Sequence, residues 1–227
     1  MSFAGKGEIS KSTVNRLALY YNILQQLRNE DRVICTSEDL GRRMNIPSSL
    51  VRKDLANFGE FGTKGVGYQI HYMIWRIEKI LGYTASWNAV VVGACMPVLP
   101  MYTSGGIFPP GIHIAAVCDL AGDKHGVPVG CGSELKIEPF KNIYEIVQKR
   151  NIVMGIVAVE QTQSQMVTNC LVEAGVTGIA NLSPIPVMVP DHVILVEINL
   201  ASRLSQITYS LNGIMTKDNR VESFCTR

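Results

Sequence analysis

The first third of the chain carries apolar residues at the spacing of short amphipathic helices. In the first of these, the apolar positions follow the i, i+3, i+4, i+7 pattern of one helical face. They are Val14, Leu17, Ala18, Tyr21 and Leu24. A hydroxyl cap at Ser12 or Thr13 starts this helix, and we predict that it runs to about Asn29.

Two shorter helices follow, separated by a tight turn. Thr36 and Ser37 open the first with two carboxylates in its first turn, where they suit the helix dipole, and the Asn-Ile-Pro segment 45–47 ends it. The second extends from Ser48 to about Phe58 and stops at a glycine. Three short helices in this order predict a helix-turn-helix core.

A glycine-rich stretch, 59–68, then changes the pattern. Its glycines permit tight turns, and we expect Phe61, Val66 and Tyr68 to pack as short strands, as in the wing of a winged helix. A fourth helix with one apolar face follows and ends at Gly82. That face consists of Ile70, Ile74, Ile77 and Leu81.

After a linker at 83–88, short β-rich runs alternate with helical patterns. The β-rich runs are 89–92, 112–118, 153–159, 178–180 and 193–197, and the helical patterns lie near 143–149 and 165–174. Alternation of this kind indicates a parallel sheet flanked by helices.

A last helix, from about Ala201 to Met215, follows the completed sheet and carries an apolar stripe. The stripe consists of Leu204, Ile207, Leu211 and Ile214. We interpret it as a subunit interface in preference to docking on its own domain. The predicted fold is therefore α/β: an N-terminal winged helix-turn-helix domain (1–82), a Rossmann-like parallel-sheet domain (83–200) and a C-terminal dimerisation helix with its tail (201–227).

Composition supports a folded globule and excludes several classes. The 227 residues are 47% apolar and 18% charged, unlike disordered or collagen-like chains. The longest strongly apolar stretch, 152–159, is far shorter than the ~20 residues of a membrane span, and the first ten residues lack the apolar core of a signal peptide. We therefore expect a cytoplasmic protein with no membrane partner.

Charge and cysteines add two further constraints. Up to Thr84 the chain has 12 Lys and Arg against 8 Asp and Glu, whereas beyond it the numbers are 9 and 11. This uneven charge favours an N-terminal part that binds a polyanion. The six cysteines form no CxxC pair, so we expect neither a zinc site nor a disulfide framework.

Candidate DNA contacts gather on the third helix. Arg52 and Lys53 lie opposite its apolar face, and an arginine can donate two hydrogen bonds to one guanine in the major groove. Hydroxyls in its first turn can hold a phosphate, and cations of the preceding helix and of the wing tip can reach the backbone. These further candidates are Ser48, Ser49, Arg42, Arg43 and Lys64. The alternative is the solvated face of an ordinary helical bundle.

A degenerate dinucleotide fingerprint follows the first strand of the second half. Gly93 is followed by Ala94, Cys95, Met96, Pro97 and Val98, so Cys95 and Val98 stand where GxGxxG has its second and third glycines. Pro97 also removes an amide donor for the phosphates. Asp119, 26 residues after Gly93, can accept hydrogen bonds from a ribose diol or cap the end of its strand.

The chain resembles the Rex family of redox-sensing transcriptional repressors. The resemblance rests on the run 51–59 (Val-Arg-Lys-Asp-Leu-Ala-Asn-Phe-Gly), on the wing glycines, and on weaker matches in the same order across roughly residues 12 to 212. It implies a homodimer that binds a double-stranded DNA operator and releases it when NADH binds. By position it assigns DNA contacts to Ser49, Arg52 and Lys53, a wing contact to Lys64, and NAD(H) binding to Gly93 and Asp119.

The sequence departs from this family mainly in the sensing machinery. Besides the degenerate loop, Asn22 replaces a positive residue of the first helix and Asn199 replaces an acidic residue before the last helix. In the family these two pair with a tyrosine to hold one domain arrangement, and Tyr102 is the candidate for that tyrosine. We expect weakened or altered NAD(H) sensing.

Two alternatives remain open on the sequence alone. A related repressor could respond to another nucleotide, such as a coenzyme A-like molecule, or to a thiol oxidant through Cys95. A Rossmann oxidoreductase with a fused front domain is the alternative from another class. The four histidines, His71, His113, His125 and His192, form no recognisable catalytic group, so we predict that the chain is not an enzyme.

Overall fold

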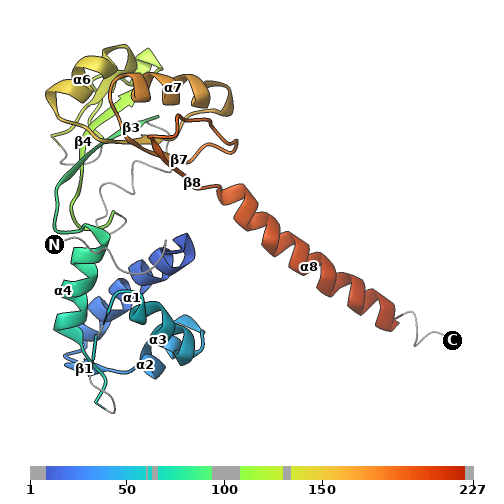
Figure 1. Ribbon diagram of the computed structural model, residues 1–227. Coiled ribbons are helices and arrows are strands. Elements are labelled where there is room, and N and C mark those ends of the chain that lie inside the picture. The colour runs from blue at the N-terminus through green and yellow to red at the C-terminus, as the bar shows by residue number, and fades with distance from the viewer. Residues whose placement is uncertain (1–8, 60, 63–65, 94–107, 130–133, 223–227) are drawn as a thin grey trace. The chain divides into compact units, whose positions relative to one another are not determined.

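A computed structural model describes residues 9–59, 61–62, 66–93, 108–129 and 134–222 of the chain, with side chains up to Ile214 in the last helix (Figure 1). The chain divides into two compact units, Met1–Ala85 and Ser86–Arg227. No helix in the described ranges is long and apolar enough to cross a membrane.

The first unit is built from four helices and a two-stranded sheet. The helices are α1 (Lys11–Asn29), α2 (Ser37–Met44), α3 (Ser48–Ala56) and α4 (Ile70–Leu81), and the strands are β1 (Ile34–Cys35) and β2 (Tyr68–Gln69). Side chains of all four helices form one core. The described elements have the order of a winged helix-turn-helix.

Two local expectations for α1 are wrong, the cap and the burial of Val14, and the predicted stripe omits Tyr20. The cap of α1 is Ser10, whose Oγ accepts a hydrogen bond from the Thr13 main-chain N–H at 3.2 Å, so neither Ser12 nor Thr13 is the cap. Val14 is exposed, and Tyr20 is fully buried. Periodicity alone could not show that Val14 is exposed, because Val14 also fits the helical spacing of the buried positions.

The glycine-rich stretch forms less strand than predicted. Tyr68 lies in β2, which pairs antiparallel with β1, a strand that the sequence pattern did not predict. Phe61 is buried in the helical core and Val66 is 59% exposed, and neither lies in a strand. Gly67 adopts φ +99°, and a Cβ there would come within 2.7 Å of the Cys35 carbonyl oxygen, so the strand pairing requires a glycine at this turn.

The second unit contains a six-stranded, fully parallel sheet in the order β5-β4-β3-β6-β7-β8. Its strands are β3 (Trp87–Val92), β4 (Ile112–Asp119), β5 (Ile137–Pro139), β6 (Met154–Val157), β7 (Gly178–Asn181) and β8 (Ile194–Glu197). The strand order reverses between β3 and β6, as in the dinucleotide-binding Rossmann fold. This confirms the predicted parallel sheet and adds β5, which the sequence pattern did not predict.

The helices of this unit pack on the sheet through alternating side chains of β3. Val90 and Val92 contact the face covered by α6 (Ile143–Lys149) and α7 (Gln161–Glu173), whereas Val91 joins a separate cluster on the opposite face (Figure 1). In the described connections after β4 and β5 the chain forms short 3₁₀ turns, Gly122–Lys124 and Phe140–Asn142. Helix α7 begins four residues before the predicted start. The apolar pattern missed these residues because the first turn of the helix is polar.

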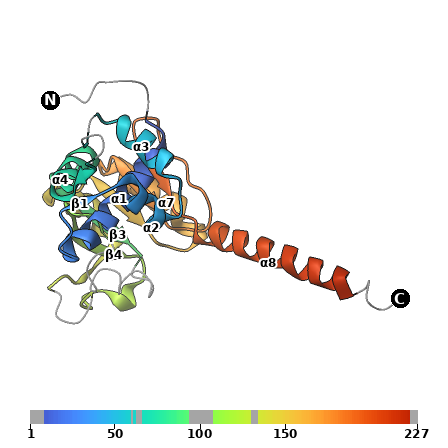
Figure 2. The ribbon, with the colours of Figure 1, turned by 90° about the horizontal axis from the view of Figure 1, so that it is seen from below.

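The last helix, α8 (Leu200–Glu222), leaves the end of β8 and runs clear of the other helices of its unit (Figures 1 and 2). Every side chain described on it, from Leu200 to Ile214, is exposed. The predicted stripe is included, with exposed fractions between 52% and 56%. An exposed apolar stripe is typical of an interface.

Candidate functional site

Helix α3 presents a polar, cationic face to solvent. Val51 and Leu55 are buried in the core of the first unit, whereas Ser49, Arg52 and Lys53 are exposed. The turn before α3 places Asn45 at φ +54°, a left-handed conformation that asparagine tolerates. The expected division of α3 into a core face and a cationic face is therefore present.

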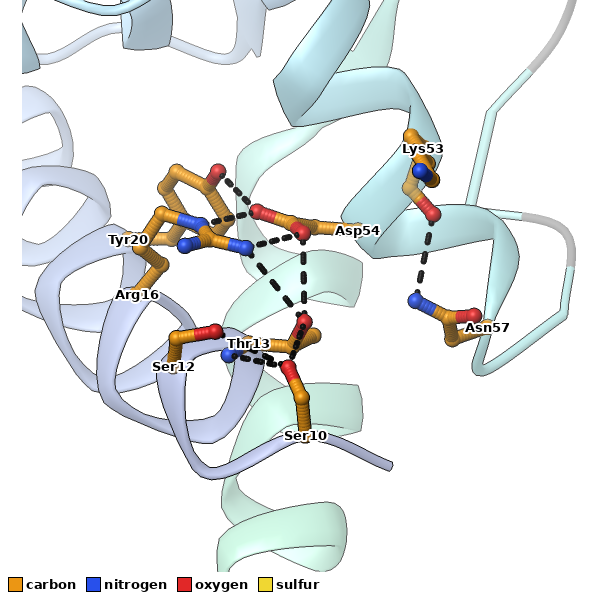
Figure 3. Close-up of polar contacts among 8 residues, drawn as sticks. All are labelled: Ser10, Ser12, Thr13, Arg16, Tyr20, Lys53, Asp54 and Asn57. Carbon is orange, nitrogen blue, oxygen red and sulfur yellow. Dashed lines mark hydrogen bonds and ion pairs between the residues drawn. The ribbon is translucent and has the colours of Figure 1, made fainter. Parts of the chain in front are cut away.

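A buried carboxylate anchors α3 to α1 (Figure 3). Asp54 is 2% exposed and receives two hydrogen bonds from Arg16, from Nε to Oδ2 at 2.6 Å and from Nη2 to Oδ1 at 2.7 Å. The Tyr20 hydroxyl donates a third at 2.8 Å, and the Thr13 hydroxyl a weaker one at 3.4 Å. These bonds satisfy a charge that would otherwise make burial very unfavourable.

The surroundings of Asp54 determine its protonation. Burial by itself raises the pKa of the Asp54 carboxyl, but the hydrogen bonds from Arg16 and Tyr20 outweigh burial and hold that pKa below its usual value. Burial, and then the neighbouring carboxylate, raises the pKa of Tyr20 well above its usual range. Asp54 is therefore ionised and Tyr20 neutral at physiological pH.

The apolar pattern of α3 did not predict this anchor, although a signal was present. Val51, Leu55 and Phe58 define an apolar stripe, and Asp54 occupies a position within that stripe. An acid on a core-facing position requires a partner. A second anchor, from Arg76 of α4, donates from Nη2 to the Phe58 carbonyl oxygen at 2.7 Å, just past the end of α3.

The cations around α3 differ in their partners. The Arg43 guanidinium is bound by Glu30, at 2.7 and 3.0 Å to its two carboxylate oxygens. The Arg52 Nη1 donates to Glu38 Oε1 at 2.9 Å and to Ser37 Oγ at 2.8 Å. Arg42 and Lys53 are exposed, and neither forms an ion pair within the described ranges. Lys64, the predicted wing contact, lies outside the described residues.

Gly93 lies where the strand order of the second unit reverses. Gly93 follows β3 with φ +105°, and a Cβ there would collide with the Ala158 carbonyl oxygen just beyond β6. Only glycine fits where the ends of β3 and β6 meet. The predicted loop residues Ala94, Cys95, Met96, Pro97 and Val98 lie outside the described residues.

Asp119 ends β4 beside this position and is engaged locally. Its Oδ1 accepts a hydrogen bond from the Ala121 main-chain N–H at 2.8 Å, and its Oδ2 lies 3.5 Å from Lys124 Nζ. The His125 ring nitrogen is 3.0 Å from the Asp119 carbonyl oxygen. Asp119 thus has the strand-end role that the sequence left open beside ribose binding.

The three expected switch residues fall in different places. Asn22 is exposed on α1 in the first unit. Asn199 caps α8, because its Oδ1 accepts from the Ser202 main-chain N–H at 2.9 Å, while its Nδ2 donates to the Pro184 carbonyl oxygen at 2.9 Å. Tyr102 lies outside the described residues.

A winged helix-turn-helix followed by a Rossmann-type sheet defines a DNA-binding protein with a nucleotide-binding type of domain. The family described as "Putative DNA-binding protein N-terminus" matches residues 8–56. The redox-sensing transcriptional repressor Rex of Carboxydothermus hydrogenoformans is 35% identical over 204 residues, which cover 90% of this chain and 97% of that protein. The Rex of Chloroflexus aggregans is 35% identical over 198 residues, 87% and 92% of the two chains. The chain belongs to the Rex family of redox-sensing transcriptional repressors.

Solved structures of RSP, a Rex-family repressor, agree with this assignment. A crystal structure of RSP in complex with beta-NAD+ and operator DNA has a TM-score of 0.85 at 26% identity, covering 94% of this chain and 97% of that one. A structure of RSP in complex with beta-NADH has a TM-score of 0.80 at 26% identity, covering 94% and 99%. Both the DNA-binding unit and the sheet unit are therefore those of a Rex repressor.

Proposed function

We propose that this protein is a transcriptional repressor that binds operator DNA as a homodimer. Its response to NADH is weaker than that of a Rex protein whose phosphate-binding loop carries all three glycines of GxGxxG. The observation that carries the proposal is the exposed cationic face of α3, held to α1 by the buried Asp54–Arg16 pair. A helix anchored in this way presents fixed donors to a major groove.

On the DNA side, each candidate residue has a distinct task. Arg52 reads a base, because its planar guanidinium can donate to guanine O6 and N7 together. Lys53 and Arg42, exposed and without an ion pair in the described part of the chain, hold phosphates. Ser48 and Ser49 offer hydroxyls beside the N-terminal amides of α3, which attract a phosphate. We assign Lys64 to the wing contact and Arg43 only to the surrounding positive field.

The carboxyl ends of β3 and β4, at Gly93 and Asp119, are the proposed site of NAD(H). The fit rests on Gly93, whose missing Cβ lets the ends of β3 and β6 approach closely at the reversal of strand order, and on the Asp119 carboxylate at the end of β4. Gly93 would carry the turn beneath the pyrophosphate, and Asp119 would accept hydrogen bonds from the ribose after exchanging its Lys124 contact. The nucleotide supplies the redox signal, and the protein does no chemistry on it.

The sequence of the loop supports weakened binding. Cys95 and Val98 put side chains at positions where bare backbone approaches a pyrophosphate, and Pro97 lacks an amide donor. Asn199 caps α8 with a neutral side chain, so it offers no charge for an ion pair with another unit. Fewer contacts of NADH therefore differ between the DNA-bound and the released arrangement, so NADH binding shifts the protein less strongly toward release.

Dimerisation through α8 completes the proposal. Its stripe, Leu204, Ile207, Leu211 and Ile214, is exposed in the single chain. A second copy would cover it, and a two-fold pair of α3 helices would then match a palindromic operator.

The decisive experiment has two parts. Selection from a random duplex library gives the preferred DNA, and gel shifts on that duplex, with and without NAD+ or NADH, measure the response. We expect an enriched palindrome, and binding that NADH weakens only slightly. Failure to enrich any sequence would refute the repressor function, whereas sub-micromolar NADH binding with full release of DNA would refute only the weakened sensing.

A further inference from the structure

The guanidinium of Arg52 is held in a small polar ring on the surface of the first unit. Arg52 Nη1 donates to Glu38 Oε1 at 2.9 Å and to Ser37 Oγ at 2.8 Å, and Ser37 Oγ donates to Glu38 Oε2 at 3.2 Å. Ser37 is 6% exposed, so one member of the ring is fixed in the protein. The side chains of Arg52 and Glu38 remain 52% and 57% exposed.

The ring uses the Nη1 nitrogen of the guanidinium and leaves the edge formed by Nε and Nη2. Nη1 carries two protons, and its two acceptors occupy both. Within the described part of the chain, Nε and Nη2 of Arg52 make no hydrogen bond. The Nε–H and Nη2–H groups are parallel, so the edge that remains is a complete two-pronged donor of the kind that guanine O6 and N7 accept.

Glu38 is ionised at neutral pH, so it can hold Arg52 Nη1 and thereby keep the Nε–Nη2 edge in place. The pKa of its carboxyl is lowered to about 2, first by the hydrogen bond from its own main-chain N–H in the first turn of α2 and then by the bond from Arg52. Because the proposed function places α3 against DNA, the exposed negative charge of Glu38, which is paired with Arg52 of that helix, also disfavours phosphate contacts that bring no base partner to Arg52.

We infer that Glu38, together with Ser37, is a positioning residue that sets the specificity of this repressor by orienting Arg52 toward one base pair. The inference rests on the proposed function, in which Arg52 reads a base. An arginine without these partners could bind phosphates and several bases by changing its rotamer. An arginine held through Nη1 presents its Nε–Nη2 edge in one orientation. Glu38 should therefore increase discrimination between sequences without increasing the general affinity for DNA.

The test is a double-mutant cycle on the palindromic duplex selected by the unmodified protein. Kd values are measured by fluorescence anisotropy for that duplex and for duplexes with each half-site base pair replaced in turn. We expect Glu38→Gln to reduce the largest discrimination ratio about 10-fold, while its binding to unrelated DNA stays equal or tightens. In the background of Arg52→Ala, Glu38→Gln should change no ratio further.

Glu30→Gln is the matched control. It removes the same charge from the same unit and breaks a comparable exposed ion pair, that with Arg43. It should leave every discrimination ratio unchanged. Ser37→Ala, which removes one of the two acceptors, should reproduce part of the loss, and thermal melting identifies any variant that fails to fold.

The possible outcomes separate the inference from the proposed function. If Arg52→Ala lowers discrimination and Glu38→Gln does not, the positioning role is refuted while the repressor function stands. If Glu38→Gln and Glu30→Gln have equal effects, the cause is net charge, and the positioning role is again refuted. If Arg52→Ala itself leaves discrimination intact, both the inference and the assigned base contact are wrong.

Discussion

Arg16 grips the carboxylate of Asp54 with two hydrogen bonds of 2.6 and 2.7 Å, although the two residues lie 38 positions apart in the chain (Figure 3). One belongs to α1 and the other to α3, whose opposite face carries Arg52 and Lys53. The bidentate geometry fixes the rotation of α3 about its own axis as well as its distance from α1. The orientation of the proposed DNA-reading face therefore depends on an ion pair on the core side of the helix.

Removal of the Asp54 carboxylate should destabilise the first unit strongly. Asp54→Ala leaves the Arg16 charge, only 23% exposed, without its partner, and we expect the free energy of unfolding to fall by about 3 kcal/mol. Urea unfolding measures this loss. Lys53→Ala, on the exposed face of the same helix, should stay within about 0.5 kcal/mol. The apolar pair Arg16→Met with Asp54→Leu should recover much of the loss, and equal destabilisation by Lys53→Ala would contradict the anchor.

The same pair predicts loss of stability in acid. Because the pKa of Asp54 is lower in the folded protein than its unfolded value of about 3.9, the unfolded state binds the proton more tightly. The stabilisation is complete above the unfolded pKa and is lost as the pH falls through the lower, folded pKa. Unfolding free energies measured between pH 7 and pH 2 should therefore decline less steeply in Asp54→Asn than in the parent. Parallel curves would show that Asp54 does not titrate as proposed.

Two cations should affect DNA binding in different ways. Arg52→Ala should cost about 1–3 kcal/mol on the selected duplex and relax the preference at one base pair, because a base contact is lost. Lys64→Ala should weaken binding to all duplexes alike and flatten the salt dependence, because a phosphate contact is lost. Anisotropy titrations at several salt concentrations distinguish the two. Unchanged binding by both variants would remove α3 and the wing from the DNA interface.

The stripe on α8 should control assembly. Leu204→Asp with Leu211→Asp places charges within the proposed apolar contact, so we expect a monomer that no longer binds operator. Light scattering at micromolar concentration measures the mass. Ser205→Asp with Tyr209→Asp adds the same charge on the opposite side of the helix and should leave the dimer intact. A monomeric parent protein would refute the interface.

Repair of the nucleotide loop should recover affinity for NADH. The unmodified loop is expected to bind at least ~10-fold more weakly than a glycine-bearing loop, about 1.4 kcal/mol. Cys95→Gly, Pro97→Leu and Val98→Gly together should regain part of this, because they restore close backbone approach and an amide donor. Calorimetric titration of both proteins with NADH measures the difference.

Release from DNA should need a second change. Asn22→Arg with Asn199→Asp, added to the repaired loop, should increase NADH-driven release, because the two domain arrangements would then differ in an ion pair. Gly93→Ala serves as a negative control for binding, since a Cβ there collides with the Ala158 carbonyl oxygen. Full release by the unmodified protein would show that neither charge is needed.

Local pattern predicted the secondary structure best where an element packs against a core on at least one face. Helix α4 and strands β3 and β4 follow the expected apolar positions, because one face or both faces of each element pack against a core. Strand β5 escaped prediction, since it is three residues long, ends in Pro139 and lies at the edge of the sheet. β1 escaped because two residues carry no period, and only pairing with β2 makes them a strand.

The sequence by itself determined the classes of element, the change from helical to alternating pattern near residue 85, the cationic face of α3 and the glycine at position 93. Periodicity reports which side of an element is buried, and the place of Gly93 in a dinucleotide fingerprint singles out that glycine. The tertiary structure alone decided that Asp54 meets Arg16, that Arg52 meets Glu38 and Ser37, and that the Asn199 amide meets the Pro184 carbonyl oxygen. The spacing of apolar residues does not encode these partners, because they depend on how whole elements pack together, and one burial pattern is compatible with many pairings of its polar side chains.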